Sequence, residues 1–299
     1  MSDFRLKIFY AVAKNLSFTK AAEELYISQP AVTKNIKELE SEYDLTLFLR
    51  KGNKIELTDA GKILLIHSEK IMNIYKQIQY DFDLLKENFS GNFQLGASTT
   101  LGQYLLPALM SQFHSKHPKI KMSLITANTE EIEKYLIEKK IELGMVEGKP
   151  KNKQLKYLPF LKDEIVAIAH TSQEISKIEI LTLDELQKVP LVLRELGSGS
   201  LDIIRDAFQA VNIQLKDLNI AMHLGSTEGI KSYLTHTNSI GFISIAAVTK
   251  DIKKGEFQVI DIEGIDIKRW FYFVYKQGVP EGNSDLFIKF ATSHYNPSL

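Results

Sequence analysis

The segment that decides the fold is Ser17-Phe-Thr-Lys-Ala-Ala-Glu-Glu-Leu-Tyr-Ile-Ser-Gln-Pro-Ala-Val-Thr-Lys-Asn-Ile36. It predicts two short helices joined by a tight turn. Phe18 and Leu25, with two alanines between them, lie on one apolar face of the first helix. Ser28 is a good N-cap for the second helix, and Pro30 falls in its first turn, where a missing N–H costs little. The segment has the pattern of a helix-turn-helix.

The second helix of this unit has an inner and an outer face. The inner face is apolar and carries Ala31, Val32, Ile36 and Leu39. The outer face carries amide, hydroxyl and ammonium groups, on Gln29, Thr33, Lys34 and Lys37. Such groups hydrogen-bond base edges and phosphates, and helix-turn-helix units place this helix in the DNA major groove. The outer face is therefore the predicted DNA interface.

Residues 47–58 follow this unit and predict a β-wing. Two short extended pieces flank Gly52-Asn53 and carry the cations Arg50, Lys51 and Lys54. Such a wing lies along a phosphate backbone; an ordinary charged hairpin is the alternative. Total charge does not decide between them, because the first 62 residues hold ten Lys or Arg against nine Asp or Glu, a net of +1.

A long helix is predicted from Thr58 or Asp59 to about Phe89. Leu64, Ile71, Ile78 and Leu85 recur every seven positions. Ser68, Tyr75 and Phe82 fill a second row four residues after the first, which gives the period of a coiled coil. A second copy of the chain is the simplest partner for such a seam; packing on its own domain is the alternative. The predicted dimerisation residues are Leu64, Ile71, Tyr75, Ile78, Phe82 and Leu85.

From Asn92 onward, short apolar runs predict strands that alternate with helices, so we expect an α/β arrangement with parallel sheets. The first predicted helix of this region spans residues 101–117. About 200 residues suffice for two small lobes. The late strand at residues 270–275 is expected to cross back to the first lobe.

Three predicted strand-to-helix junctions are rich in hydroxyl groups and glycines: residues 98–102, 194–200 and 225–229. In open α/β sheets, ligands bind at such junctions, and exposed amides there suit a carboxylate or sulfate. Arg194 would add charge-assisted hydrogen bonds. Each junction alone is more simply an ordinary helix cap. The sequence does not show whether two of them meet in one cleft.

Several function classes find no support in the sequence. There is no Gly-x-Ser-x-Gly elbow, Walker A sequence or dinucleotide fingerprint, so an enzyme is a minor alternative. The chain has no Cys, and its seven His show no metal-ligand spacing. Its apolar runs are too short for a signal peptide core or a membrane span. We expect a soluble, cytoplasmic protein without cofactor or metal.

The chain resembles the LysR-type transcriptional regulators. The resemblance rests on motifs in order along the first 61 residues: Phe4-x4-Phe9 with Ala11-Val12, Ser17-Phe18-Thr19-x-Ala21-Ala22, Leu25-x2-Ser28-Gln29-Pro30-Ala31-Val32-Thr33, Ile36-x2-Leu39-Glu40, Leu47-Phe48-x-Arg50 and Leu57-Thr58-x-Ala60-Gly61. Asn53 and Glu56 stand where the family often carries cations. This departure puts in doubt the usual strength of phosphate contact by the wing.

The resemblance implies three parts. Residues 1–61 form a winged helix-turn-helix domain, with the helix-turn-helix at 18–37, and residues 62–90 form a linker and dimerisation helix. Residues 91–299 form a two-lobed α/β effector domain like a type 2 periplasmic binding protein. Its first lobe comprises about 92–162 and 267–299, and its second about 163–266.

The resemblance also implies site residues. Those assigned to DNA are Ser28, Gln29, Pro30, Ala31, Thr33, Lys34, Lys37, Arg50 and Lys54. Those assigned to the effector cleft are Ser98, Thr99, Thr100, Glu147, Arg194, Gly197, Ser198, Gly199, Ser200 and Thr227.

The function expected from this resemblance is regulation of promoter DNA binding by a small metabolite. The expected partners are double-stranded promoter DNA, the effector, further copies in a dimer or dimer of dimers, and RNA polymerase. Residues 98–107 and 194–200 look most like the branch that regulates sulfur and cysteine metabolism, which suggests sulfite, sulfate or a small carboxylate as effector. A solute-binding protein without regulatory role is the runner-up.

Overall fold

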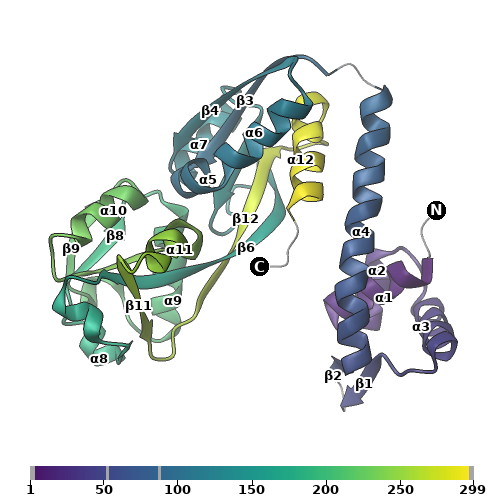
Figure 1. Cartoon of the computed structure of the whole chain (residues 1–299), viewed down its shortest axis with the longest axis horizontal. Helices are drawn as coiled ribbons and strands as arrows, with labels where there is room; N and C mark the ends of the chain where they lie inside the picture. The colour runs from purple at the N-terminus through teal and green to yellow at the C-terminus, as the bar shows by residue number, and fades with distance from the viewer. Residues whose placement is uncertain (1–3, 52–53, 87–88, 296–299) are drawn as a thin grey trace. The chain divides into compact units, whose positions relative to one another are not determined.

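The computed structural model describes residues 4–51, 54–86 and 89–295, and the chain divides into two compact units (Figure 1). The first unit comprises residues 1–88 and 289–299, and the second comprises residues 89–288. Each unit is described by itself.

The first unit begins with three helices, α1 (Phe4–Asn15), α2 (Phe18–Glu24) and α3 (Gln29–Tyr43). A hairpin of β1 (Phe48–Lys51) and β2 (Lys54–Leu57) and the long helix α4 (Asp59–Lys86) follow. The predicted N-cap of α3 is confirmed, because the Ser28 hydroxyl accepts the Ala31 N–H. Tyr26 supplies the turn before it with a φ of 54°. The helix-turn-helix and the wing hairpin are therefore both present.

The core of the first unit forms where the inner faces of these helices meet the wing. Phe48 of β1 lies against Phe9 and Phe18, with ring centroids 5.4 and 5.7 Å apart. Val32, Ile36 and Leu39 of α3 are buried in the same cluster, as the apolar spacing predicts. Burial of that face leaves the other side of α3 exposed.

The predicted dimerisation residues of α4 differ in burial. Leu64 is half-buried and packs against the core of the first unit. The predicted residues Ile78 and Phe82 are exposed, and so are the apolar side chains of Ile63, Ile66 and Ile74. Ile71 and Tyr75 are half-buried, and the side chain of Leu85 lies outside the described residues.

The second unit is built on a sheet of strand order β4-β3-β5-β12-β6-β10-β8-β9, with β11 also paired to β6, and β7 to β11. Its first part comprises β3 (Gly91–Ser98), α5 (Thr99–Tyr104), α6 (Leu106–Lys116), β4 (Ile120–Ala127), α7 (Thr129–Ile137) and β5 (Leu143–Glu147). The strands β4, β3 and β5 pair in parallel, as predicted.

Its second part comprises β7 (Ile180–Leu181), α8 (Leu183–Leu186), β8 (Leu191–Arg194), α9 (Gly199–Ala210), β9 (Ile220–Leu224), α10 (Thr227–Leu234), β10 (Ile240–Ser244), α11 (Ile245–Lys253) and β11 (Phe257–Ile262). Short 3-10 turns lie at Glu174–Lys177 and Leu215–Asp217. The strands β10, β8 and β9 pair in parallel, and their core is separate from that of the first lobe.

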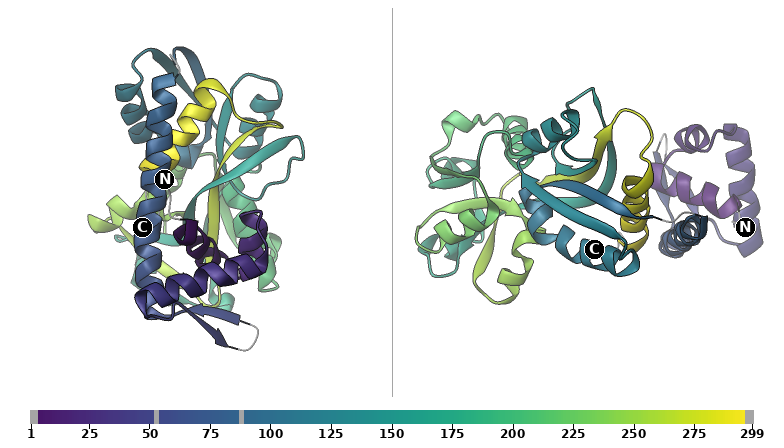
Figure 2. Two further views of the ribbon diagram at one scale, coloured as in Figure 1. Left: turned by 90° about the vertical axis from the view of Figure 1, so that its right-hand side faces the viewer. Right: turned by 90° about the horizontal axis from the view of Figure 1, so that it is seen from above.

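Two long strands, β6 (Leu155–His170) and β12 (Ile267–Lys276), run through both lobes (Figures 1 and 2). They pair with each other antiparallel over the whole of β12, with one register shift between Phe271 and Tyr272. The expectation of parallel sheets is therefore wrong for this pair. The predicted lobe boundary at 162–163 falls inside β6. The helix α12 (Gly282–His294) follows β12.

The predicted single helix at residues 101–117 is also wrong. It consists of α5 and α6, which meet at Leu105. Pro107 is the second residue of α6 and has no N–H to continue the hydrogen bonding of α5. The interruption makes α5 a short helix directly behind the Ser98 junction.

Candidate functional sites

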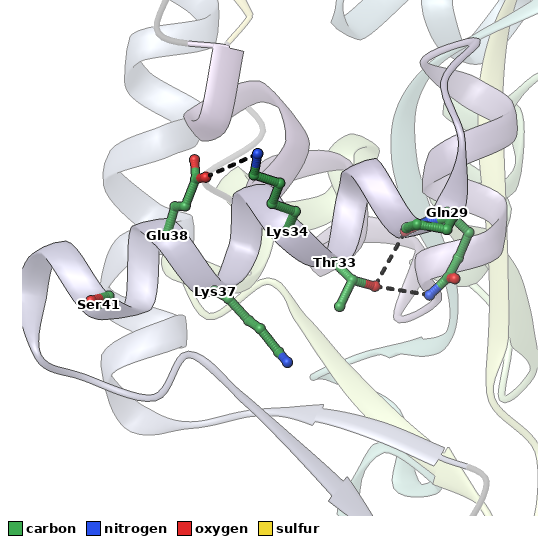
Figure 3. A pocket seen from close by; sticks show the side chains of 7 residues that line it. Gln29, Thr33, Lys34, Lys37, Glu38 and Ser41 are labelled. Carbon is green, nitrogen blue, oxygen red and sulfur yellow. Dashed lines mark hydrogen bonds and ion pairs between the residues drawn. The ribbon is translucent and has the colours of Figure 1, made fainter.

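The outer face of α3 forms a shallow groove (Figure 3). Its lining consists of Gln29, Pro30, Thr33, Lys34, Lys37, Glu38 and Ser41. Five of these were predicted to contact DNA; Glu38 and Ser41 were not. Gln29, Pro30, Lys34 and Lys37 are exposed, whereas Thr33 and Ala31 are half-buried.

The polar side chains of this groove are held along the helix. Gln29 Nε2 donates to the Thr33 hydroxyl at 2.9 Å, and that hydroxyl donates to the Gln29 carbonyl at 3.2 Å. Lys34 Nζ lies 3.8 Å from a Glu38 carboxylate oxygen. Figure 3 shows Lys37 pointing away from that pair. An amide, a hydroxyl and two cations therefore line the groove.

Glu40 connects α3, the recognition helix expected in the major groove, to the wing hairpin. Its Oε1 accepts the N–H groups of Leu47 at 2.7 Å and Phe48 at 3.3 Å. The carboxylate therefore fixes where β1 starts relative to α3. The side chains of Arg50 and Lys54 lie outside the described residues, and so does the turn at 52–53.

In the second unit, two of the predicted junctions meet at Glu147, the last residue of β5. The Glu147 carboxylate accepts hydrogen bonds from Ser98, from Thr100 at 3.3 Å and from Ser200 at 3.3 Å. Ser98 and Thr100 belong to the first lobe and Ser200 to the first turn of α9 in the second. All four residues are at most 4 % exposed. The lobes therefore share one buried polar site.

Glycines allow this close approach. A Cβ on Gly199 would lie 2.0 Å from the Glu147 carbonyl oxygen, so a side chain there would push the lobes apart. Gly197 has a φ of +83°, which favours glycine. Its carbonyl accepts the Glu130 N–H of the first lobe. Both predicted glycines thus have a structural role at the site.

Two charged residues in this site were not predicted, Arg269 of β12 and Asp163 of β6. Arg269 Nε donates to Asp163 Oδ2 at 2.7 Å, and Arg269 Nη1 donates to the Ser200 hydroxyl at 2.7 Å. Ser244 donates to the other Asp163 oxygen at 2.7 Å. Arg269 Nη1 also lies 3.9 Å from Glu147. A chain of polar contacts therefore runs from Ser244 through Arg269 to Glu147.

The sequence contains one signal that would have found Arg269. It stands at an alternate position with Ile267, Phe271 and Phe273, all of which face the core. A charge at such an inward position needs a partner.

Arg194 is buried at the end of β8. It pairs with Glu195 through Nε at 2.7 Å and Nη2 at 2.9 Å, and Nη2 also donates to the Gly225 carbonyl at 3.4 Å. Thr227 is buried at the start of α10, and within the described residues it makes no hydrogen bond to the Glu147 network.

Several buried polar atoms near these junctions have no hydrogen-bond partner within the described part of the chain. They are Thr99 Oγ1, Arg194 Nη1, Ser198 Oγ and Arg269 Nη2. Three belong to predicted cleft residues, and the fourth belongs to Arg269. Buried donors are rarely left unpaired, so each of these four atoms needs an explanation.

A second polar contact joins the lobes beside the site. The Tyr104 hydroxyl of α5 donates to the Glu228 carboxylate of α10. Lys231 Nζ lies 2.6 Å from Glu228 and 2.8 Å from Asp251, and it stands 5.3 Å from the centroid of the Tyr104 ring. Burial and the Glu228 carboxylate raise the pKa of Tyr104, so its hydroxyl remains a donor.

The described residues contain no group of three or more His, Cys, Asp or Glu placed to hold a metal ion. None of the helices in the described part of the chain is long and apolar enough to cross a membrane.

Two family models match this chain. One, described as "Bacterial regulatory helix-turn-helix protein, lysR family", matches residues 4–62, and the other, "LysR substrate binding domain", matches residues 86–295. The match to the helix-turn-helix model argues against the runner-up, a solute-binding protein.

Curated relatives extend over most of the chain. The HTH-type transcriptional regulator CysL of Bacillus subtilis is 27 % identical over 98 % of both chains. A probable RuBisCO transcriptional regulator of Trieres chinensis is 33 % identical over 89 % of this chain and 87 % of its own. Since regulators with different names match about equally well, the sulfur and cysteine branch stays a prediction.

Solved structures share the fold. CrgA, a LysR-type regulator from Neisseria meningitidis, has a TM-score of 0.74 at 20 % identity and covers 98 % of this chain and 97 % of its own. The regulatory domain of Synechocystis PCC6803 CcmR, solved in complex with 2-PG, has a TM-score of 0.61 at 25 % identity, covering 68 % of this chain and 97 % of its own. This chain belongs to the LysR family of transcriptional regulators.

Proposed function

We propose that this LysR-type regulator binds promoter DNA through the α3 groove and that a small anion in the cleft between its lobes changes this binding. The observation that carries the proposal is the set of buried, unpartnered donors beside two junctions that meet at Glu147. Guanidinium and hydroxyl donors in a dry site suit a carboxylate, sulfate or phosphate group. The CcmR regulatory domain, similar to this effector domain, was solved in complex with 2-PG.

The proposed assembly is a dimer, or a dimer of dimers, formed through α4. Its support is the row of exposed apolar side chains, of which Ile74, Ile78 and Phe82 lie at four-residue spacing on one face. Two copies would present two recognition helices to two half-sites of the promoter DNA. We place this assembly in the cytoplasm, with RNA polymerase at the promoter as a further partner.

The DNA interface is tested by fluorescence anisotropy with the full chain and DNA from upstream of its own gene. Gln29→Ala is expected to cost about 1–3 kcal/mol of discrimination between operator and scrambled DNA, if its amide reads a base. Lys37→Ala should weaken binding to both DNAs and make the salt dependence shallower. Lys14→Ala is the matched control, since Lys14 is exposed on α1, outside the α3 groove. Unchanged binding by both α3 variants would overturn this interface.

The effector site is tested by calorimetric titration of sulfate, sulfite, acetate and 2-PG into the full chain, followed by anisotropy with each anion that binds. We expect at least one anion to bind and to shift DNA affinity. Thr100→Ala should weaken the response to it while leaving DNA binding without the anion intact. Binding of a cationic or apolar metabolite, with none of these anions bound, would overturn the anionic class.

A further inference from the structure

The Glu147 carboxylate is held in the way that a bound anion would be held. Ser98 donates to one of its oxygens, and Thr100 and Ser200 donate to the other at 3.3 Å. Arg269 Nη1 stands 3.9 Å from that second oxygen. Three hydroxyls that donate to one carboxylate, with a guanidinium nearby, form what we call the anion cradle.

The cradle is assembled from both lobes. Ser98, Thr100 and Glu147 come from the first lobe, Ser200 from the second, and Arg269 from a strand that runs through both. The side chain of Glu147 is 1 % exposed, so the carboxylate depends on these donors in place of water. Whatever fills the cradle therefore holds the two lobes together.

We propose that Glu147 is a built-in occupant of the anion cradle, which an anionic effector must displace from Ser98, Thr100 and Ser200 in order to bind. The inference rests on the proposed function for the identity of the effector class. It assigns Glu147 a specificity and regulatory role: its charge opposes anion entry, and its departure frees the donors that hold the lobes. The unpartnered atoms Arg269 Nη2 and Ser198 Oγ would then complete the hydrogen bonding of the incoming group.

The occupancy of the cradle is tested without knowing the natural effector. Glu147→Ala in the full chain removes the carboxylate and leaves its donors, so formate should bind in its place. We expect the thermal midpoint of Glu147→Ala to rise by about 3–5 °C for each tenfold increase in formate above its Kd. The wild-type midpoint should not respond to formate in the same range.

Glu133→Ala is the matched control for formate. Glu133 is a half-buried carboxylate of the same lobe that accepts from the Tyr157 hydroxyl at 2.8 Å, but it lies outside the cradle. It should show no saturable response. Adding Ser98→Ala to Glu147→Ala should weaken the formate effect. An equal response of wild type and Glu147→Ala, or none in Glu147→Ala, would overturn the proposal.

Glu147→Gln keeps the shape of the side chain and removes its charge, and it serves if the alanine variant does not fold. Two like charges about 4 Å apart at a protein surface repel by enough for a tenfold change or more in affinity. We expect each anion that binds the wild type to bind Glu147→Gln at least about tenfold more tightly. If Glu147→Gln binds the anion equally or more weakly than the wild type, the proposed displacement of Glu147 by the anion is wrong.

The two ideas fail in different ways. Suppose that none of sulfate, sulfite, acetate and 2-PG binds the wild type or Glu147→Gln, but formate still stabilises Glu147→Ala. The proposal of an anionic effector is then wrong, and the proposal that Glu147 occupies the cradle is supported. If an anion shifts DNA binding of the wild type but Glu147→Gln binds it no better, the proposed function stands and the built-in occupant fails.

Discussion

Replacement of Arg269 by methionine tests whether the polar chain between the lobes is a stabilising unit. Both partners of the Arg269–Asp163 pair are almost fully buried, with side-chain exposures of 0 % and 2 % and a separation of 2.7 Å. Arg269→Met removes the guanidinium and leaves Asp163 with only the Ser244 hydrogen bond among those described. Breaking a buried pair on one side costs about 3–5 kcal/mol, because the remaining charge is uncompensated.

The assay is urea unfolding followed by fluorescence of Trp270, the single tryptophan of the chain. Trp270 follows Arg269 on β12, and Lys162 of β6 lies 5.5 Å from the centroid of its ring, so its signal reports on this part of the second unit. A loss of that size lowers the urea midpoint by about 1–2 M. Adding Asp163→Asn should restore part of the loss, because it neutralises the stranded carboxylate.

Lys149→Met is the matched control. Lys149 and Asp206 are also 2.7 Å apart, but Lys149 is 61 % exposed, so the pair is expected to contribute about 0–1 kcal/mol. The reasoning is refuted if Arg269→Met and Lys149→Met shift the midpoint equally, or if Asp163→Asn lowers the stability of Arg269→Met further.

Three further outcomes follow from the structure. Glu40→Ala should destabilise the wing by about 1–3 kcal/mol, since two backbone N–H groups lose their acceptor; faster hydrogen exchange at those two amides would show it, and unchanged protection would contradict it. Ile78→Glu should weaken self-association in analytical ultracentrifugation while Lys70→Glu, at an exposed polar position of α4, does not. Burial lowers the pKa of His117 below its ordinary value. As the pH falls through about 6.5, His117 is therefore protonated in the unfolded chain before it is protonated in the folded chain, and the free energy of unfolding decreases. His117→Gln should make this pH dependence of urea unfolding shallower, and an equally steep decrease would contradict the prediction.

The elements best predicted from the sequence are those with strong local signals. Helix α10 and strand β10 have such signals, because a Ser226 cap precedes an amphipathic helix and a short apolar run follows it. The recognition helix likewise follows from Ser28 and its apolar spacing. Such signals depend on neighbouring residues alone.

The features that were missed depend on partners distant in the chain. Residues 155–164 of β6 carry a weak strand signal of their own, since they include Pro159 and several charged residues. Those residues are extended because β12 pairs with them over ten positions. Arg269 and Asp163 are 106 positions apart, and no motif of either strand announces their contact. The junctions at residues 98–102 and 194–200 likewise meet only through the tertiary structure, so the sequence alone could not predict their contact at Glu147.

The paired strands β6 and β12 determine how the lobes can move. A single-stranded linker would leave the lobes free to move, whereas the backbone hydrogen bonds between β6 and β12 restrict their relative motion. Its register shift, where Phe271 pairs with Leu161 and Tyr272 with Pro159, interrupts the regular ladder at one point. A torsional pivot there stands two residues from Arg269. A rotation of one lobe about this point would displace the guanidinium relative to the first lobe, so the polar chain and the angle between the lobes would change together.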